Sequence, residues 1–166
     1  NASLYRIDKE DPKTNDNREV TDKDEFRHQG LELEARGKLS DNWDVSAGYS
    51  YLDAEDKKTG LTPNDVPNQT FSLWTAYQPA DQWRIGGGVN YISDRYAGDA
   101  EAVELAGYTT VDLMTAYSMG KHNLQLNLNN ALDKEYALGA TNGTSGKNQI
   151  GLGAPRTWLL TYNYEF

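Results

Sequence analysis

The sequence contains no cysteine, few basic residues and no long apolar run, and each absence removes a class of protein. Without cysteine there are no disulfides, thiolate metal ligands or thiol nucleophiles. The net charge of -9 at pH 7 argues against a nucleic-acid partner, because phosphate binding requires a basic surface. No segment approaches the ~20 apolar residues of a transmembrane helix, which excludes a helical membrane protein. A transmembrane β-barrel is still allowed, because its strands are only half apolar.

Length and composition narrow the class further. The 166 residues suffice for one domain with a core and are too few for two. Eleven tyrosines, four tryptophans and fifteen glycines are unusual for an acidic soluble protein, and they suit aromatic girdles and a tightly packed lumen. Residues 1–4 are not a charged start followed by an apolar run, so an exported protein would be represented here by its mature chain or a piece of it.

Apolar and polar residues alternate in eight segments, and this pattern predicts eight β-strands. The C-terminal segment, residues 158–166, shows it most clearly, with mostly polar residues between its apolar ones. The apolar series of this terminal strand is Trp158, Leu160, Tyr162, Tyr164 and Phe166. The other strands are predicted at residues 2–9, 25–39, 43–53, 68–77, 83–92, 108–119 and 122–130. Helical periodicity is convincing nowhere.

Short and long connections alternate between these strands. Turn-forming residues predict short connections at 40–42, 78–82 and 120–121. Long polar connections are predicted at 10–24, 54–67, 93–107 and 133–156. An up-and-down outer-membrane barrel has this signature, with short periplasmic turns and long extracellular loops. Because eight is even, both termini are expected on the periplasmic side.

The alternating faces are open to two interpretations. Either the aromatic-rich face covers a soluble protein core, or it meets lipid while the polar face lines a lumen. The loop asymmetry and the terminal Phe166 favour the membrane, because a terminal ring suits an aromatic girdle at the interface. We therefore predict an all-β, antiparallel, up-and-down transmembrane β-barrel, with residues 1–166 as a single barrel segment.

Five ordered blocks make the chain resemble the C-terminal end of a TonB-dependent siderophore receptor of the bacterial outer membrane. The first is GLELEA at 30–35 with WDVSAGYSY at 43–51 and DAE at 53–55. The others are VPNQTFSLW at 66–74, GYTTVD at 107–112, LNLNNALDKEY at 126–136, and PR at 155–156 ahead of the terminal strand. The apolar series of that strand also resembles the terminal signal by which outer-membrane barrels are recognised for assembly.

The resemblance implies a receptor for ferric siderophores, whose barrel of 22 strands is closed by a plug domain. The plug, the TonB-binding box and most of that barrel are not in this sequence, which would supply the last eight strands or a small closed barrel made from them. The implied partners are the lipid bilayer with lipopolysaccharide, a ferric siderophore and the barrel-assembly machinery. The plug domain and TonB are partners only through the missing N-terminal part.

Glu32 and Glu34 are the first candidate site residues, because both fall on the predicted lumen face. Similarity to the family suggests that they pair with plug arginines. Bidentate carboxylate–guanidinium hydrogen bonds suit a contact that must hold the plug and later release it. The alternative is that these carboxylates are satisfied within the barrel wall by Arg36, Lys38 or Arg84.

Arg95, Tyr96 and Tyr136 form the second candidate group, in predicted extracellular loops near strand ends. A cation and aromatic rings at such positions can contact an anionic, aromatic iron chelate. The alternative is an interfacial girdle and a solvated loop. Residues 86–88 are three glycines inside a predicted strand, where close packing or curvature is expected rather than a phosphate site.

An enzyme is the rival class, since some small outer-membrane barrels act on lipids. The two histidines, His28 and His122, are predicted at opposite membrane faces, so no paired-histidine metal site is expected. No nucleophile motif supports a catalytic serine. We expect no catalytic residue, metal or cofactor, and the alternative function is a free-standing eight-stranded barrel with a structural, adhesive or lipid-modifying role.

Overall fold

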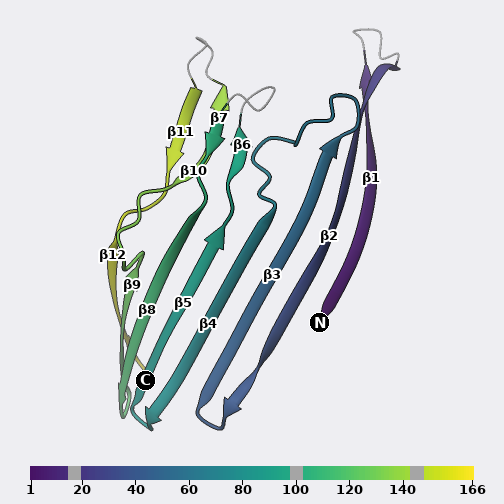
Figure 1. The fold of residues 1–166 in the computed structure, drawn as a ribbon. Helices are drawn as coiled ribbons and strands as arrows, with labels where there is room; N and C mark the ends of the chain where they lie inside the picture. Colours follow the sequence, from purple (N-terminus) through teal and green to yellow (C-terminus); the bar gives the residue numbers. More distant parts are fainter. Residues whose placement is uncertain (15–19, 98–102, 143–147) are drawn as a thin grey trace.

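The computed structural model describes residues 1–14, 20–97, 103–142 and 148–166, and this part of the chain is an all-β fold (Figure 1). Eight of its strands form one sheet in the order β1-β2-β3-β4-β5-β8-β9-β12. Their bounds are β1 Ala2–Thr14, β2 Val20–Ser40, β3 Trp43–Asp56, β4 Gln69–Ala80, β5 Trp83–Ile92, β8 Tyr108–Met119, β9 His122–Asn129 and β12 Thr157–Tyr164. Two hairpins lie outside the sheet, β6 Arg95–Ala97 with β7 Val103–Leu105, and β10 Ala137–Asn142 with β11 Asn148–Leu152.

The sheet is an up-and-down meander, as predicted. Each strand pairs antiparallel with the one that precedes it in the sheet. Within the described ranges β1 and β12 are not paired with each other, so they are the two edges of an open sheet. No helix in these ranges is long and apolar enough to cross a membrane. The eight predicted strands are confirmed, and those at 83–92 and 108–119 have the predicted bounds.

The register sorts the side chains into two faces, because residues directly opposite each other in antiparallel strands share a face. One face, called the apolar face, contains the row Leu33, Tyr49, Phe71 and Tyr91. The other, called the polar face, contains the adjacent row Glu34, Gly48, Ser72 and Asn90. The predicted division of each strand into an apolar and a polar side is therefore confirmed.

The short connections are two-residue turns, at positions 41–42, 81–82 and 120–121. The predicted turn at 78–82 was too long, since β4 continues to Ala80 with an irregularity in register between Tyr77 and Ala80. In the third turn Gly120 has φ 60°, a left-handed conformation that glycine adopts without steric cost. We call this edge of the sheet the turn end.

The long connections contain more strand than predicted, and the expected bounds at this edge, the loop end, were wrong. The connection predicted at 10–24 is largely hairpin, with Glu10 opposite Glu25 and Lys13 opposite Asp22. The connections predicted at 93–107 and 133–156 contain the β6–β7 and β10–β11 hairpins. A hairpin that is exposed to water on both faces satisfies its backbone groups by pairing between its two strands. Its side chains can be polar on both faces, so the sequence shows no apolar alternation that would predict the strands.

Buried side chains gather at the loop end. Among the described residues with buried side chains, only Ala76 lies near the turn end, and the largest apolar side chains of the sheet are exposed. Those at or beyond the upper ends of the strands are Ala54, Ser93, Arg95, Ala97, Leu105, Tyr108, Thr110 and Asn130. The sheet thus has no conventional core beneath it.

Candidate functional site

Aromatic residues border the apolar face at two levels. Near the turn end, the rings of Trp43 and Tyr77 are 5.8 Å apart, and those of Trp83 and Tyr117 are 4.7 Å apart. The upper row, which includes Tyr49, lies six residues further along β3 than Trp43. At ~3.4 Å per residue this is about 20 Å along the strand. Mostly aliphatic and small residues fill the band between the two levels, including Val45, Ala47, Leu73, Val89, Val111 and Leu113.

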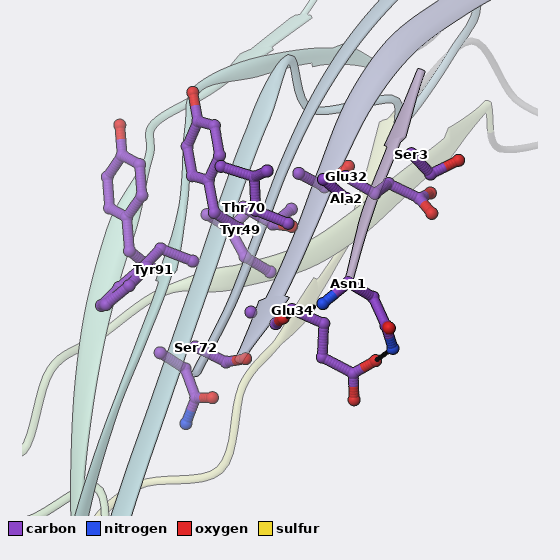
Figure 2. A pocket seen from close by; sticks show the side chains of 15 residues that line it. Asn1, Ala2, Ser3, Glu32, Glu34, Tyr49, Thr70, Ser72 and Tyr91 are labelled. Carbon is purple, nitrogen blue, oxygen red and sulfur yellow. Dashed lines mark hydrogen bonds between the residues drawn. The ribbon is translucent and has the colours of Figure 1, made fainter. Parts of the chain in front are cut away.

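Glu32 and Glu34 border a hollow of about 460 Å³ on the polar face (Figure 2). The small residues Gly48, Ser50 and Ser72 lie beside them and leave this space open. The Asn1 amine donates to the backbone oxygen of Glu34 at 2.8 Å, and the Asn1 side-chain amide donates to its carboxylate at 3.4 Å. We call this region, which is bordered by the two glutamates, the acidic hollow.

The alternative, that the Glu32 and Glu34 carboxylates are paired with cations of the barrel wall, is only partly confirmed. The nearest guanidinium nitrogen of Arg36 is 3.8 Å from the Glu34 carboxylate, and both side chains are more than half exposed. Such exposed pairs contribute little to stability. The Glu32 carboxylate has no hydrogen-bond or ion-pair partner in the described part of the chain. Lys38 and Arg84 bond elsewhere, to the Asp41 backbone oxygen and the Asp44 carboxylate.

A second hollow, of about 400 Å³, lies on the polar face toward the turn end, and Trp74 is among the residues that line it. Its charged lining residues are Arg36, Lys38, Asp44 and Arg84. A Cβ atom added at Gly88 would lie 2.5 Å from Cε3 of Trp74, and one at Gly86 would lie 3.1 Å from its Cζ2. Gly86 and Gly88 therefore make room for the ring, in agreement with the predicted close packing. Sequence reasoning missed Trp74, although its polar-side parity in β4 was available as a signal.

Arg95 is a structural centre of the loop end. Its side chain is 4% exposed, and its Nε donates to the carboxylate of Asp65. Its Nη2 donates to the backbone oxygens of Ala137 (3.1 Å) and Leu138 (2.8 Å). We call Arg95, Asp65 and these two carbonyls the Arg95 cluster. It joins the β3–β4 connection, β6 and β10.

Tyr96 and Tyr136 are chain neighbours of this cluster, since Tyr96 follows Arg95 and Tyr136 precedes Ala137. The Tyr136 ring packs on Tyr108 with centroids 4.3 Å apart and covers Gly153. The backbone oxygen of Tyr96 accepts a hydrogen bond from the Asp65 amide at 2.7 Å. Both tyrosines are half-buried. The structure thus brings the three predicted loop residues to one region, and their contact with a chelate stays a prediction.

Asn130 is a second centre at the loop end, which sequence reasoning missed. It is 4% exposed and has φ 48°, a left-handed conformation that asparagine tolerates. Its Nδ2 donates to the oxygens of Lys134 (2.9 Å) and Ala154 (3.1 Å), and its Oδ1 accepts from the Lys134 amide. Its own amide donates to Asp112 at 2.8 Å. Two consecutive asparagines after an alternating strand were the available signal.

The terminal strand β12 continues the apolar face to the sheet edge. Trp158 lies opposite Leu128, and Leu160 lies opposite Leu126. The ring of Tyr164 lies 5.2 Å from that of Phe166, which follows the end of the strand. This confirms the shared face of Trp158, Leu160, Tyr162 and Tyr164, while their role in assembly stays a prediction.

The two histidines lie at opposite ends of the sheet. His28 pairs with Ile7 and Ala54 toward the loop end. His122 follows a turn, and its Nδ1 lies 2.8 Å from the hydroxyl of Tyr162. Within the described ranges, no group of three histidine, aspartate or glutamate side chains is arranged to hold a metal ion.

Comparison with known proteins agrees with this geometry. A sequence model of the family described as TonB dependent receptor-like, beta-barrel matches residues 1–131. The chain is 34% identical over 149 residues to the ferric-pyoverdine BN7/BN8 receptor of Pseudomonas putida, covering 83% of this chain and 17% of that receptor. It is 36% identical over 150 residues to the ferrioxamine receptor of Yersinia enterocolitica, covering 83% and 21%.

Solved structures with a similar fold are also receptors of this kind by name. The siderophore receptor PiuA from Acinetobacter baumannii superposes with a TM-score of 0.83 at 27% identity, over 98% of this chain and 25% of that one. The closed form of the ferric-catecholate import receptor Fiu from Escherichia coli K12 gives 0.82 at 29% identity, over 99% and 25%. By name these relatives are receptors rather than enzymes. The chain spans about a sixth to a quarter of their length.

Proposed function

This chain belongs to the TonB-dependent receptor-like β-barrel family, and from this premise we propose that it forms part of the wall of an outer-membrane receptor that takes up ferric siderophores. The relatives reported above are named for ferric pyoverdine, ferrioxamine and ferric catecholates. The observation that carries the proposal is the family match over an open, two-faced sheet bordered by aromatic rows. Catalysis has no part in it.

The open edges favour a large barrel over a small closed one. A strand edge with unpaired backbone groups is not tolerated in lipid, so β1 and β12 require further strands beside them. The relatives are about four to five times as long as this chain, which is long enough for those further strands and for a separate plug. In such a receptor, residues 1–166 are one segment of the barrel wall. A free-standing eight-stranded barrel would instead pair β1 with β12.

The two faces and the two ends of the sheet support one orientation in the membrane. The apolar face, with its aromatic rows, meets the bilayer and the adjoining lipopolysaccharide, and the polar face lines the lumen. The turn end, with both chain ends directed toward it, lies in the periplasm, and the loop end is extracellular. The exposed apolar series on β12 is the segment that the barrel-assembly machinery recognises.

The two candidate groups take different parts in uptake. Tyr96 and Tyr136 face the ligand at the extracellular end, where their rings contact an aromatic chelate, and Arg95 acts from its buried cluster by supporting the two tyrosines rather than by direct contact. Glu32 and Glu34 bind plug arginines, since the Glu32 carboxylate is unpaired and the Glu34 carboxylate is weakly paired across an open hollow. TonB acts through that plug.

The proposal is tested in source cells by the mass of the native polypeptide and by its transport. An antibody to residues 133–156 is expected to detect an outer-membrane band several times heavier than 18.6 kDa. Deleting the gene is expected to abolish uptake of one radioactive iron chelate from a panel of pyoverdine, ferrioxamine and catecholate types. A band at 18.6 kDa, or full uptake of every chelate in the deletion strain, contradicts the proposal.

The plug role of Glu32 is tested by Glu32→Gln in that receptor. We expect faster hydrogen exchange in the plug, because an amide cannot form the charged pair with arginine. Glu104→Gln, an exposed substitution in β7, is the matched control. Unchanged plug protection in Glu32→Gln would remove this role.

A further inference from the structure

The apolar face is hollowed over β4 and β5, toward the turn end. One row of this face runs through Val45, Thr75, Gly87, Leu113 and Leu128. Gly87 adds no side chain to the row, and Thr75 beside it is small. The result is a hollow of about 420 Å³, which we call the Gly87 groove.

Aromatic and aliphatic side chains form the walls of the Gly87 groove. Trp43 and Tyr77 lie one row nearer the turn end and meet edge to face, and Ile85 lies opposite Tyr77. Leu113 lies opposite Gly87 on the other side. These four side chains are 38% to 46% exposed, so their surfaces are available to a molecule in the groove. The strand backbone at Gly87 is its floor.

The Thr75 hydroxyl and the Trp43 indole nitrogen satisfy each other. Trp43 Nε1 donates to Thr75 Oγ1 at 2.6 Å, and this hydroxyl donates to the backbone oxygen of Asp44 at 3.1 Å. The same bonds hold the indole ring in place, so this wall is formed before an occupant arrives. The groove therefore offers apolar contact without a requirement for hydrogen bonds at its floor, which suits hydrocarbon.

Gly87 is not required for packing within the sheet, in contrast to its neighbours. A Cβ atom at Gly86 or Gly88 would meet the Trp74 ring on the polar face. A Cβ atom at Gly87 would meet Cδ2 of Leu113 at 3.3 Å, a contact that the end of a flexible side chain can relieve. The space above Gly87 is thus left for something outside the sheet.

The position of the groove limits what can occupy it. It lies over the middle of the sheet (Figure 1), whereas further strands of a barrel would join at the β1 and β12 edges. A domain in the lumen would lie against the polar face instead. The connections at this end are two-residue turns, which are too short to fold over the face. Under the proposed function, the bilayer is the neighbour that remains.

We propose that the Gly87 groove holds one acyl chain of a phospholipid as a resident ligand, lying over Gly87 between Trp43 and Leu113. The inference rests on the proposed function, which places the apolar face in the bilayer and the turn end in the periplasm. Because the groove adjoins the lower aromatic pair, its occupant comes from the periplasmic leaflet rather than from the lipopolysaccharide at the loop end. A chain that fills the groove gains dispersion contacts that a flat face cannot give.

The test uses the full-length receptor in outer-membrane vesicles that contain phosphatidylethanolamine with a diazirine on its acyl chain. After illumination, crosslinked residues are located by mass spectrometry. Leu126 and Leu128 lie at the levels of Ile85 and Gly87 on the same face but outside the groove. We expect labelling of the groove walls about tenfold above that of these leucines, which corresponds to ~1.4 kcal/mol, or roughly ten additional carbon–carbon contacts.

Gly87→Leu fills the groove and is expected to lower its labelling to the level of Leu126 and Leu128. Gly37→Leu is the matched control, because Gly37 lies opposite Val45 in the same row and does not line the groove. Heat-modifiable mobility in gels shows whether each variant is folded. If Gly87→Leu is not, Gly87→Ala takes its place and should lower the labelling by a smaller factor.

Three results would overturn the inference: equal labelling of the groove and the two leucines, unchanged labelling in the folded Gly87 variant, or labelling of the groove by a diazirine lipid A in place of the phospholipid. The leucines separate this inference from the proposed function. If they are labelled as strongly as the groove, only the resident lipid is refuted. If neither the leucines nor the groove is labelled, the contact of the apolar face with the bilayer is refuted as well.

Discussion

The loop end and the wall of the sheet are stabilised in different ways. In the wall, the antiparallel ladders satisfy the backbone, and side chains lie on two exposed faces with Ala76 as a rare buried residue of the described chain. At the loop end, the buried side chains of Arg95 and Asn130 hold the backbone of connections that are distant in sequence. A sheet with both faces exposed has little core of its own, and in the described chain compact packing arises where loops fold over strand ends.

The physical reason is the supply of backbone partners. A strand inside the sheet finds partners on both sides, whatever its side chains are. A long connection has no such ladder, so its carbonyl groups require side-chain donors or short hairpins of their own. Substitutions should therefore cost most at the loop end, less within the wall and least at exposed ion pairs.

The largest effect is expected for Arg95→Met. It removes the pair with Asp65 and both bonds to the β10 carbonyls. The Asp65 side chain is 45% exposed, so water can solvate its carboxylate once Arg95 is gone. We therefore expect the free energy of unfolding of this region to fall by about 3 kcal/mol, the low end of the range for breaking a buried ion pair. Hydrogen exchange of the amides at 137–140 should accelerate accordingly. Arg156→Met, at an exposed position, is the control, and equal exchange in both variants would contradict the structural role of Arg95.

A smaller effect is expected for Asn130→Ala. The variant loses three side-chain hydrogen bonds and places alanine at φ 48°, at a total cost of about 2 kcal/mol. Asn130→Asp keeps the acceptor oxygen and tolerates the conformation, so it should lose less. Hydrogen exchange of the amides at 131–135 measures the loss of stability in both variants. If alanine and aspartate behave alike, the Nδ2 bonds account for the whole effect.

Within the wall, Gly88→Ala should cost about 1–2 kcal/mol, because its Cβ displaces Trp74 or shifts β5. Gly37→Ala is the matched control, since a Cβ there meets nothing within 4 Å. Urea unfolding of the receptor, followed by its heat-modifiable mobility in gels, compares the two. In a Trp74→Ala background the penalty of Gly88→Ala should fall but not vanish, because the added Cβ still lies 2.9 Å from the backbone oxygen of Leu73. An unchanged penalty would mean that this backbone contact accounts for all of it.

The smallest expected effect is a pH dependence of stability that arises from Asp8, a residue of β1 that lies beyond the upper aromatic row. A hydrogen bond from Arg27, at 3.0 Å, lowers the pKa of Asp8 below its ordinary value of 3.8 despite some desolvation, and Arg6 and Lys57 lower it further. A lowered pKa stabilises the folded state above about pH 4, and this contribution is lost as the pH falls through the folded value. Amide protection factors in the β1–β2 hairpin, corrected for the intrinsic exchange rate at each pH, should therefore fall slightly in acid. Asp8→Asn should remove that dependence, and a wild-type response in Asp8→Asn would contradict it.

Much of the wall was predictable from sequence. Alternation in β5 and β8 placed both strands at their observed bounds, and parity alone put Glu32 and Glu34 on the polar face. The hairpin at 10–24 was not predictable, because its polar residues alternate with other polar residues. Among the site residues, Arg95 was selected for its charge at a loop, whereas its burial and its bonds to β10 depend on a segment more than forty residues away.

The sequence by itself determined which side chains share a face and where the chain reverses, because period-two alternation and turn chemistry are local properties. Only the tertiary structure decided that Trp74 lies across Gly86 and Gly88, and that Arg95 meets Asp65 and Leu138. These contacts depend on the register between strands and on the folding of one connection over another. Both are set by many weak contacts acting together, and none of those contacts is visible in the residues of a single segment.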